Sequence, residues 1–376
     1  MTPHARHAQH DARQRRRTVA LLGCLALIGS LAACSASPSA TGTTAGAHSE
    51  ATAGPSPAPL HPNVVTTLPV AMWLSGPAVT QQRLWYWDEG HGTITSVDRR
   101  TGQLGRTISL GPSDRSPYGS PKTVAVGPSG VWVADALHQR LLRIDPATQT
   151  VVARVPLTPP RGSKVTGPIT PFGLLVDAHG VWTTDFDRGL LAHVDPAKAV
   201  VDKVTSLAAG AGNIDEGFGT LWVAEDHASK VARVSPTTGA VVAQIDVKTA
   251  AGPCEGCFDR VVVDGSSIWV PFYNQQVLLR IDTSRDAVTQ EVHTDITLGG
   301  TVIAGGDLWI AGGDGTPDPH AQVERLDEST GVVKQRIPVP YAAGVAALPT
   351  DNPTTLWVTT VQGETSGSLQ ELKIDG

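Results

Sequence analysis

Four carboxylates recur along the chain, each three residues after a tryptophan, and their spacing suits them to attract a cation or an amine. They are Asp88, Asp135, Asp185 and Glu225, whereas the next three equivalent positions hold Phe272, Gly312 and Thr360. A carboxylate at the end of a strand also caps the following loop by accepting backbone N–H bonds. We favour this local role because such caps are common, and the cation or amine site stays the alternative.

Glu225 and His227 are the candidate catalytic residues. They flank Asp226, and general-base catalysis needs a histidine beside a carboxylate that adjusts its basicity. A solvated loop histidine is the simpler interpretation. The sequence contains no Gly-x-Ser-x-Gly elbow, no phosphate-binding loop and no His-Glu-x-x-His helix. We therefore favour a protein without catalytic activity and keep catalysis as the alternative.

Further candidates for ligand binding lie in the same loops and at the expected mouth of the fold. The loop candidates are His91, His138, Arg188 and Asp226. The mouth candidates are Tyr118, Lys122, Phe172, Asp259, Arg260, Tyr273 and Asn274. A mouth that mixes aromatic and charged side chains is typical of sites for small molecules or peptides.

Residues 314–320 form an unusually long connection that carries oxygen ligands suited to calcium. Asp314 and Asp318 are among them, but the segment lacks the register of a known calcium loop. The sequence therefore assigns no cofactor and no metal ligand, and a divalent cation, Mg²⁺ or Ca²⁺, remains an alternative.

The elements that position these side chains follow from a repeat. Seven tryptophans each follow a branched aliphatic residue, at spacings of 47, 50, 40, 47, 40 and 48 residues. They are Trp85, Trp132, Trp182, Trp222, Trp269, Trp309 and Trp357. Repeats of this length built from short strands predict the blades of a β-propeller. The predicted fold is all-β, with seven four-stranded antiparallel blades.

The second repeat shows the expected blade most clearly. Residues 123–126 are a short apolar run, residues 131–134 follow a Pro-Ser-Gly turn, and residues 140–144 alternate polar and apolar side chains. Asp145 and Pro146 then form a turn, because Asp accepts backbone N–H bonds and Pro presets φ. Residues 150–157 supply the outermost strand.

The two ends of the repeat region predict how the ring closes. The last repeat has strands at residues 344–348, 355–359 and 368–374 but no fourth strand. Residues 64–70 match the fourth-strand pattern and precede the first tryptophan repeat. We expect this N-terminal strand to complete the C-terminal blade, which leaves no open seam. The alternative is that residues 64–70 only end the preceding linker. Residues 63–376 therefore form one domain.

The repeated residues carry a family resemblance. The block Gly-x-Leu/Val-Trp-Val-Ala-Asp/Glu, then Val/Leu-x-Arg-Ile/Val-Asp-Pro, resembles the repeats of YVTN, NHL and streptogramin-lyase-like propellers, most closely at residues 219–242. The resemblance covers residues 64–376. It implies the fold, and it implies that a lyase of this kind would use a histidine base and carboxylates that hold Mg²⁺ on one face. These families also include lactonase-like hydrolases and binding modules, so the fold does not choose the function.

The first 33 residues have the pattern of a lipoprotein signal peptide. Five arginines, the last three at Arg15, Arg16 and Arg17, precede an apolar stretch too short to span a bilayer. The stretch ends in Leu-Ala-Ala-Cys, which resembles a lipobox and makes Cys34 the expected lipidated residue. The alternatives are cleavage before Cys24 and an ordinary secretory signal.

Residues 34–62 are predicted to be a flexible tether, because Ser, Thr, Ala, Gly and Pro bury too little surface to order it. Removing the signal removes five arginines and Asp11 and leaves 24 basic and 34 acidic residues, a net charge of −10. This balance disfavours binding to nucleic acid.

The closely spaced Cys254 and Cys257 predict a disulfide that braces a loop, since thiols outside the cytoplasm are usually oxidised. Metal binding would need more ligands than the neighbourhood supplies, and a thioredoxin-type redox site would need a helix N-terminus in a βαβ context. We keep redox chemistry as the alternative.

The sequence as a whole predicts a monomeric propeller anchored through Cys34 to the outer face of a bacterial cell membrane. Its expected role is to bind an unidentified small molecule or protein on the face richest in loops. The enzyme alternative is a metal-assisted lyase or lactone hydrolase. A third alternative, a scaffold of the cell envelope, predicts a large exposed apolar patch.

Overall fold

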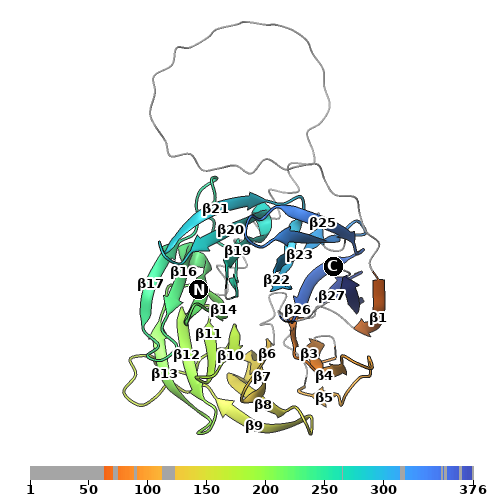
Figure 1. The fold of residues 1–376 in the computed structure, drawn as a ribbon. Coiled ribbons are helices and arrows are strands. Elements are labelled where there is room, and N and C mark those ends of the chain that lie inside the picture. Colours follow the sequence, from red (N-terminus) through yellow and green to blue (C-terminus); the bar gives the residue numbers. More distant parts are fainter. Residues whose placement is uncertain are drawn as a thin grey trace, which may run out of the picture. The chain divides into compact units, whose positions relative to one another are not determined.

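The computed structural model describes residues 63–70, 75–88, 91–111, 123–264, 266–313, 318–348, 350, 354–363 and 366–374, all within one unit, His48–Gly376. Seven four-stranded antiparallel sheets form the blades of a ring, with one edge strand of each sheet nearest the axis and the other at the outside (Figure 1). The predicted seven-bladed β-propeller is confirmed.

The strands of blades 1 to 4, from the axis outward, are β2 (Ser75–Val79), β3 (Arg83–Asp88), β4 (Thr93–Asp98), β5 (Ile108–Ser109); β6 (Val124–Gly127), β7 (Gly130–Asp135), β8 (Arg140–Asp145), β9 (Thr150–Pro156); β10 (Leu174–Val176), β11 (Val181–Asp185), β12 (Leu190–Asp195), β13 (Val200–Ser206); and β14 (Ala211–Gly217), β15 (Thr220–Glu225), β16 (Lys230–Val234), β17 (Val241–Asp246). Those of blades 5 to 7 are β18 (Val262–Val263), β19 (Ile268–Phe272), β20 (Val277–Asp282), β21 (Ala287–His293); β22 (Thr297–Ala304), β23 (Asp307–Gly313), β24 (Gln322–Asp327), β25 (Val333–Pro338); and β26 (Ala342–Ala347), β27 (Thr354–Val361), β28 (Gly367–Ile374), β1 (Asn63–Val70). Single-turn 3-10 helices follow the second strands of three blades: η1 (Ala136–His138), η2 (Asp226–Ala228) and η3 (Tyr273–Gln275).

The repeat tryptophans hold neighbouring blades together. Trp132 of blade 2 packs with Leu190 and Val194 of blade 3, and Trp357 of blade 7 packs with Leu84 of blade 1. All seven rings are at most 1% exposed. Burial of about 200 Å² by one ring contributes on the order of 5 kcal/mol at about 25 cal/mol per Å², so these contacts fix the register between blades.

The ring closes through its N-terminal strand, as the sequence predicts. β1 pairs antiparallel with β28 from Asn63 opposite Lys373 to Val70 opposite Gly367, with an irregularity between Val64 and Thr66. The chain's first described strand is therefore the outermost strand of its last blade.

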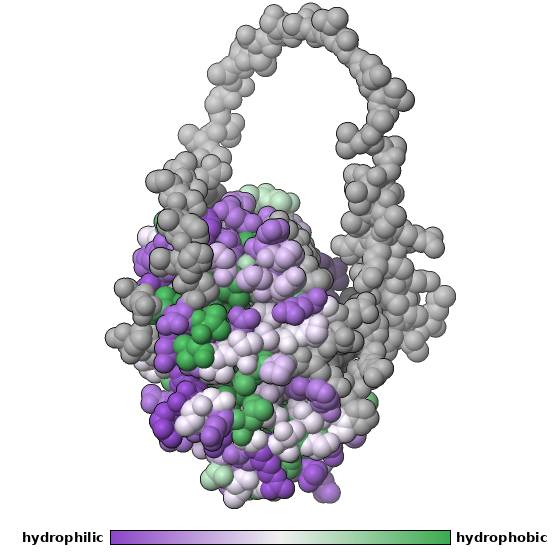
Figure 2. Space-filling model, turned by 90° about the vertical axis from the view of Figure 1, so that its right-hand side faces the viewer, coloured by the Kyte–Doolittle hydropathy of each residue, from purple (hydrophilic) through white to green (hydrophobic). Residues whose placement is uncertain are grey.

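Two faces result from this topology. The loop face carries the connections from second to third strands and from each fourth strand to the next blade, whereas the hairpin face carries the turns between first and second and between third and fourth strands. The flank that bears β1 shows apolar residues in separate patches among polar ones (Figure 2). Within the described ranges, no helix has the length and apolarity needed to cross a bilayer.

Candidate functional site

The four carboxylates that follow the tryptophans lie on the loop face, at the ends of second strands, and all are buried. Asp88 accepts the backbone N–H of His91 at 3.1 Å and lies 2.9 Å from the Nδ1 atom of the same residue. Asp135 lies 2.9 Å from Nδ1 of His138 and accepts Nε of Arg140 at 2.8 Å. Both carboxylates therefore fix the loop that follows their own strand.

In blades 3 and 4 the equivalent carboxylates bind a backbone group in the connection that precedes their own blade. Asp185 accepts the backbone N–H of Thr170 at 3.0 Å, and Glu225 accepts that of Ala208 at 2.8 Å. Gln244 also donates to Glu225, at 3.0 Å. Burial raises the pKa of Asp185 and of Glu225, and these hydrogen bonds oppose the rise. Asp88 and Asp185 accept backbone N–H groups of the loop that follows their own strand, from His91 at 3.1 Å and from Arg188 at 3.2 Å, as the capping role predicts, whereas the Glu225 contacts lie outside that loop.

The side chains of Glu225, Asp226 and His227 contact different parts of the molecule. While Glu225 binds Ala208 and Gln244, Asp226 accepts the backbone N–H groups of Gly256, Cys257 and Phe258 at 2.8, 3.0 and 3.3 Å. The His227 ring packs edge-on against Phe186, with centroids 5.0 Å apart. Across the described residues, no three His, Cys, Asp or Glu side chains are grouped so that they could hold a metal ion.

The segment that Asp226 binds contains the predicted disulfide. Cys254 and Cys257 are bonded, with their Cα atoms 5.7 Å apart. Phe258, the next residue, is buried and stacks on Phe272 of β19 at a centroid distance of 4.9 Å. The disulfide loop is thus fixed to blade 4 by a carboxylate and to blade 5 by an aromatic stack.

Three of the predicted mouth residues lie together beyond this loop. The Tyr273 hydroxyl accepts the backbone N–H of Asp259 at 3.2 Å and Nε of Arg260 at 3.1 Å. The Arg260 guanidinium also pairs with Asp259 at 3.2 Å and lies over the Tyr273 ring. The side chains of Asp259 and Arg260 are each 32% exposed. The four buried carboxylates that end second strands, Asp88, Asp135, Asp185 and Glu225, are called the rim carboxylates here. Unlike them, Asp259 and Arg260 can be reached from solvent.

A half-buried aromatic row lies on the blade 3 side of this cluster. The Phe172 and Phe186 rings are 5.0 Å apart, and Phe186 meets His227 at the same distance. Arg188 orders the neighbouring connection by donating to the carbonyls of Thr166 and Pro168, each at 2.8 Å. The sequence predicted roles for Phe172 and His227 but missed Phe186. Its position directly after the rim residue Asp185 was the available signal.

The connection from β13 to β14 and the start of β14 join the aromatic row to the charged cluster. Gly210 donates its backbone N–H to the Phe186 carbonyl at 3.0 Å, and Asn213 donates to the Asp259 carbonyl at 2.6 Å. Gly212 is required here, because a Cβ atom would lie 2.3 Å from the Asp259 carbonyl oxygen. We call the six residues around this connection the mouth surface: Phe172, Phe186, His227, Asp259, Arg260 and Tyr273.

The other predicted mouth residues are not part of the mouth surface as defined here. Tyr118 and Lys122 lie outside the described residues, as do residues 314–317 of the long sixth-repeat loop. Asn274 belongs to η3, but its side chain is likewise not described. The described part of the long loop shows Asp318 accepting the backbone N–H of His320 at 2.8 Å, which is a turn contact.

The innermost strands that line the ring axis carry few charges. Among their described residues, Asp215 and Glu216 of β14 are the ionisable ones. Asp215 accepts the backbone N–H of Val263, in blade 5, and that of Glu216, each at 2.8 Å. Burial raises the pKa of Asp215 to about 7. This carboxylate links two blades rather than marking an open site.

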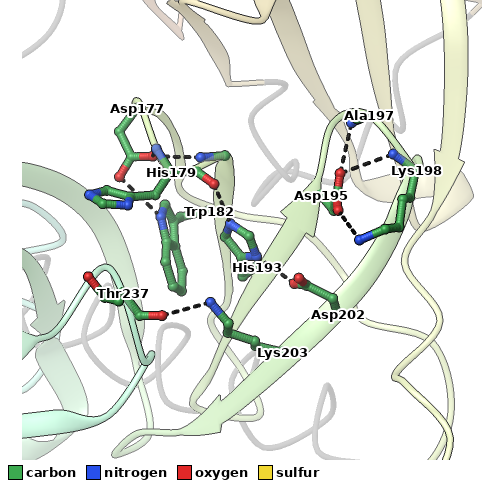
Figure 3. A network of polar contacts seen from close by, with 11 residues as sticks. Asp177, His179, Trp182, His193, Asp195, Ala197, Lys198, Asp202, Lys203 and Thr237 are labelled. Carbon is green, nitrogen blue, oxygen red and sulfur yellow. Dashed lines mark hydrogen bonds and ion pairs between the residues drawn. The ribbon is translucent and has the colours of Figure 1, made fainter.

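A polar network on the hairpin face of blade 3 has a structural origin (Figure 3). In blades 2, 4, 5 and 6 an arginine lies opposite the repeat tryptophan, as Arg143 does opposite Trp132. Blade 3 instead pairs Trp182 with the buried His193, and Lys203 supplies the cation. The His193 ring lies between Asp202, at 2.5 Å, and the His179 carbonyl, at 3.1 Å.

No protein-family model and no curated protein matches the chain. Solved structures do match it. A streptogramin B lyase has a TM-score of 0.60 at 14% identity, covering 81% of this chain and 98% of that one. The chain has the propeller fold of the streptogramin lyases. Virginiamycin B lyase from Staphylococcus aureus matches at 0.58 and 16% identity, over 81% and 99% of the two chains. BamB from Moraxella catarrhalis matches at 0.51 and 16%, over 80% and 86%. At these identities the comparisons establish the fold alone.

Proposed function

We propose that this propeller is a binding module and that the mouth surface holds its ligand. The observation that carries the proposal is a contrast in exposure: the mouth surface is half-buried in every member, whereas the rim carboxylates are buried. Aromatic faces beside a guanidinium and a phenol suit a ligand that has a flat apolar part and a polar or anionic group.

Binding is favoured over lyase or hydrolase chemistry by the way the candidate catalytic groups are used. Glu225 is buried and bonded to Ala208 and Gln244, and Asp226 is bonded to the disulfide loop. A general base and its carboxylate partners would need to converge on one reacting atom. The lyase alternative keeps its support in the fold shared with two streptogramin-type lyases.

The expected location of the module is the outer surface of a bacterial cell membrane. The proposal rests on the lipobox-like sequence ending at Cys34 and the linker-like composition of residues 34–62. Replacing Cys34 with Ala in the full chain is expected to move the protein from the membrane fraction to the soluble fraction. Retention of the variant in the membrane would contradict the anchor.

A titration with 2-naphthalenesulfonate tests the mouth surface, because this probe has a flat aromatic part and an anion. We expect saturable binding to the full chain, weakened about tenfold by Phe186→Ala and by Arg260→Gln. Val242→Thr is the matched control, since Val242 is 55% exposed on an outer strand of blade 4. Equal affinity in all four proteins would refute the proposed site.

Incubation with a streptogramin B and Mg²⁺ distinguishes the alternative. Cleavage of the antibiotic by the wild-type protein, but not by His227→Ala, would support the lyase alternative and contradict the binding module. Intact antibiotic after prolonged incubation is the result expected here.

A further inference from the structure

Backbone conformation singles out two aromatic residues. Non-glycine residues with positive φ among those described are Gln139, Gln149, Ala199, Phe218, Ser229, Gln276, Asp286 and Tyr341. Six of them occupy positions that recur in the repeat, either after a 3-10 turn or at the end of a third-to-fourth-strand turn. Phe218 and Tyr341 do not. A bulky residue in this conformation is uncommon and costs free energy, so its presence calls for a reason.

Phe218 sits at the tip of the hairpin that joins β14 to β15. Gly217 pairs with Thr220, and the two residues between them, Phe218 and Gly219, have φ values of 54° and 68°. Two central residues with positive φ define a type I′ turn, which favours Asn or Gly at the first central position. Phenylalanine is a poor choice for this turn.

Blade 6 builds the same turn with the preferred residues. Ala304 pairs with Asp307, and the central residues Gly305 and Gly306 have φ values of 62° and 77°. In both blades the tryptophan of the second strand donates its indole N–H to the carbonyl just before the turn, at 3.0 Å: Trp309 to Ala304 and Trp222 to Gly217. The fold therefore makes this hairpin without an aromatic residue.

The Phe218 side chain is only partly buried in return. It is 39% exposed, and a Cβ atom added to the neighbouring Gly219 would meet nothing within 4 Å. Where they are described, the equivalent turns of the other blades carry no large apolar residue at the tip; Ser129, His179 and Ser266 are examples. A large apolar side chain at a projecting tip is thus a feature of blade 4 among the described hairpins.

The surroundings of this tip are acidic. Glu216 is exposed two residues before Phe218, and Gly217 lies against the backbone of Asp264 in blade 5. Burial and the nearby Asp177 carboxylate of blade 3 raise the pKa of Glu216, and His179 opposes the rise. A basic group on a partner would be attracted here.

We propose that Phe218 anchors a docking surface on the hairpin face for a segment of a partner protein in which an apolar side chain adjoins Lys or Arg. The tip is convex and cannot enclose a small molecule, whereas a protein surface can offer a pocket for an aromatic anchor. This surface lies on the face opposite the mouth surface, and its test does not depend on the mouth ligand.

The first test measures stability. Phe218→Asn and Phe218→Gly in the full chain are expected to raise Tm by about 2 °C, because the new residues suit the turn. A lower Tm in both variants would mean that Phe218 is needed for packing and would overturn the proposal.

The second test measures recognition with a random peptide library displayed on phage. Wild-type protein is expected to enrich peptides that place an apolar residue beside Lys or Arg, with affinity about tenfold weaker for Phe218→Asn. Glu216→Gln should weaken the same peptides and reduce the salt dependence of binding. Val242→Thr, which removes an exposed apolar side chain from the same blade, should bind them normally.

Two outcomes would overturn this assignment. One is the enrichment of no common motif, or of peptides without a basic residue. The other is equal binding of the selected peptides by wild-type protein and Phe218→Asn.

Discussion

The two faces of the ring use carboxylates in opposite ways. On the hairpin face, Asp145 and Asp195 accept backbone N–H bonds from residues two and three positions ahead. Hydrogen bonds, above all from the backbone of Thr148 and from the Lys198 ammonium respectively, lower the pKa of both carboxyls. On the loop face of blades 3 and 4, burial raises the pKa of Asp185, Glu225 and Asp226.

The difference teaches what each face contributes to stability. A turn aspartate organises residues that are already neighbours in the chain, so its removal disturbs one turn. Asp226 instead holds backbone groups 30 to 32 residues away in the connection to the next blade. Since a buried donor that loses its acceptor costs more than an exposed one, the loop face should be the more sensitive to substitution.

The largest expected effect follows from removing the Asp226 carboxylate. Asp226→Ala leaves the N–H groups of Gly256, Cys257 and Phe258 without this acceptor, and we expect a loss of about 3 kcal/mol in the free energy of unfolding. Denaturant unfolding of the full chain measures it. Asp226→Asn is the matched control, because the amide oxygen still accepts, and it should lose much less. Equal losses in the two variants would contradict the claim that Asp226 stabilises the loop face by accepting backbone N–H groups.

The disulfide is expected to have the next largest effect. Opening the short ring between Cys254 and Cys257 should cost about 2 kcal/mol, by the entropy of closing a loop of this size. The Cys254→Ser, Cys257→Ser double variant and the reduced wild-type protein should agree in denaturant unfolding. Hydrogen exchange should then be faster at Asp259 and Arg260, which follow the loop. Unchanged exchange at these two residues would show that the disulfide does not position the mouth surface.

The sequence predicted the structural features that repeat along the chain and missed the contacts between residues of different repeats. Tryptophan spacing gave the number of blades, and the strand pattern of residues 64–70 gave the closure by β1, because both follow from a repeated unit. The role of Asp226 could not be read, since its partners lie in another repeat. Phe186 was missed because its neighbours Phe172 and His227 come from different connections.

The ring axis extends the comparison to a third environment. Burial raises the pKa of Asp215 to about 7 in the folded protein, well above its usual value of about 3.9. The folded state therefore binds more protons than the unfolded state between these values, and the contribution of Asp215 to stability falls as pH rises from about 4 through about 7. Asp215→Asn should therefore gain stability relative to wild type steadily as pH rises from about 5 to about 7, and gain no more above about pH 7. A stability difference between the variant and wild type that does not change with pH would show that Asp215 does not take up the proton.

The smallest effect is expected for a turn aspartate of the hairpin face. Hydrogen bonding, first of all from the Lys198 side chain, lowers the pKa of Asp195 to about 2, so the folded state holds fewer protons than the unfolded state just above this pH. Its stabilising contribution is present above about pH 4 and is lost as pH falls through about 2. Asp195→Asn should therefore lower Tm slightly at pH 7 and leave it unchanged near pH 2. A Tm loss at pH 7 as large as that of Asp226→Ala would contradict the division of roles between the faces, because it would place a structural carboxylate in a turn that local bonds already organise.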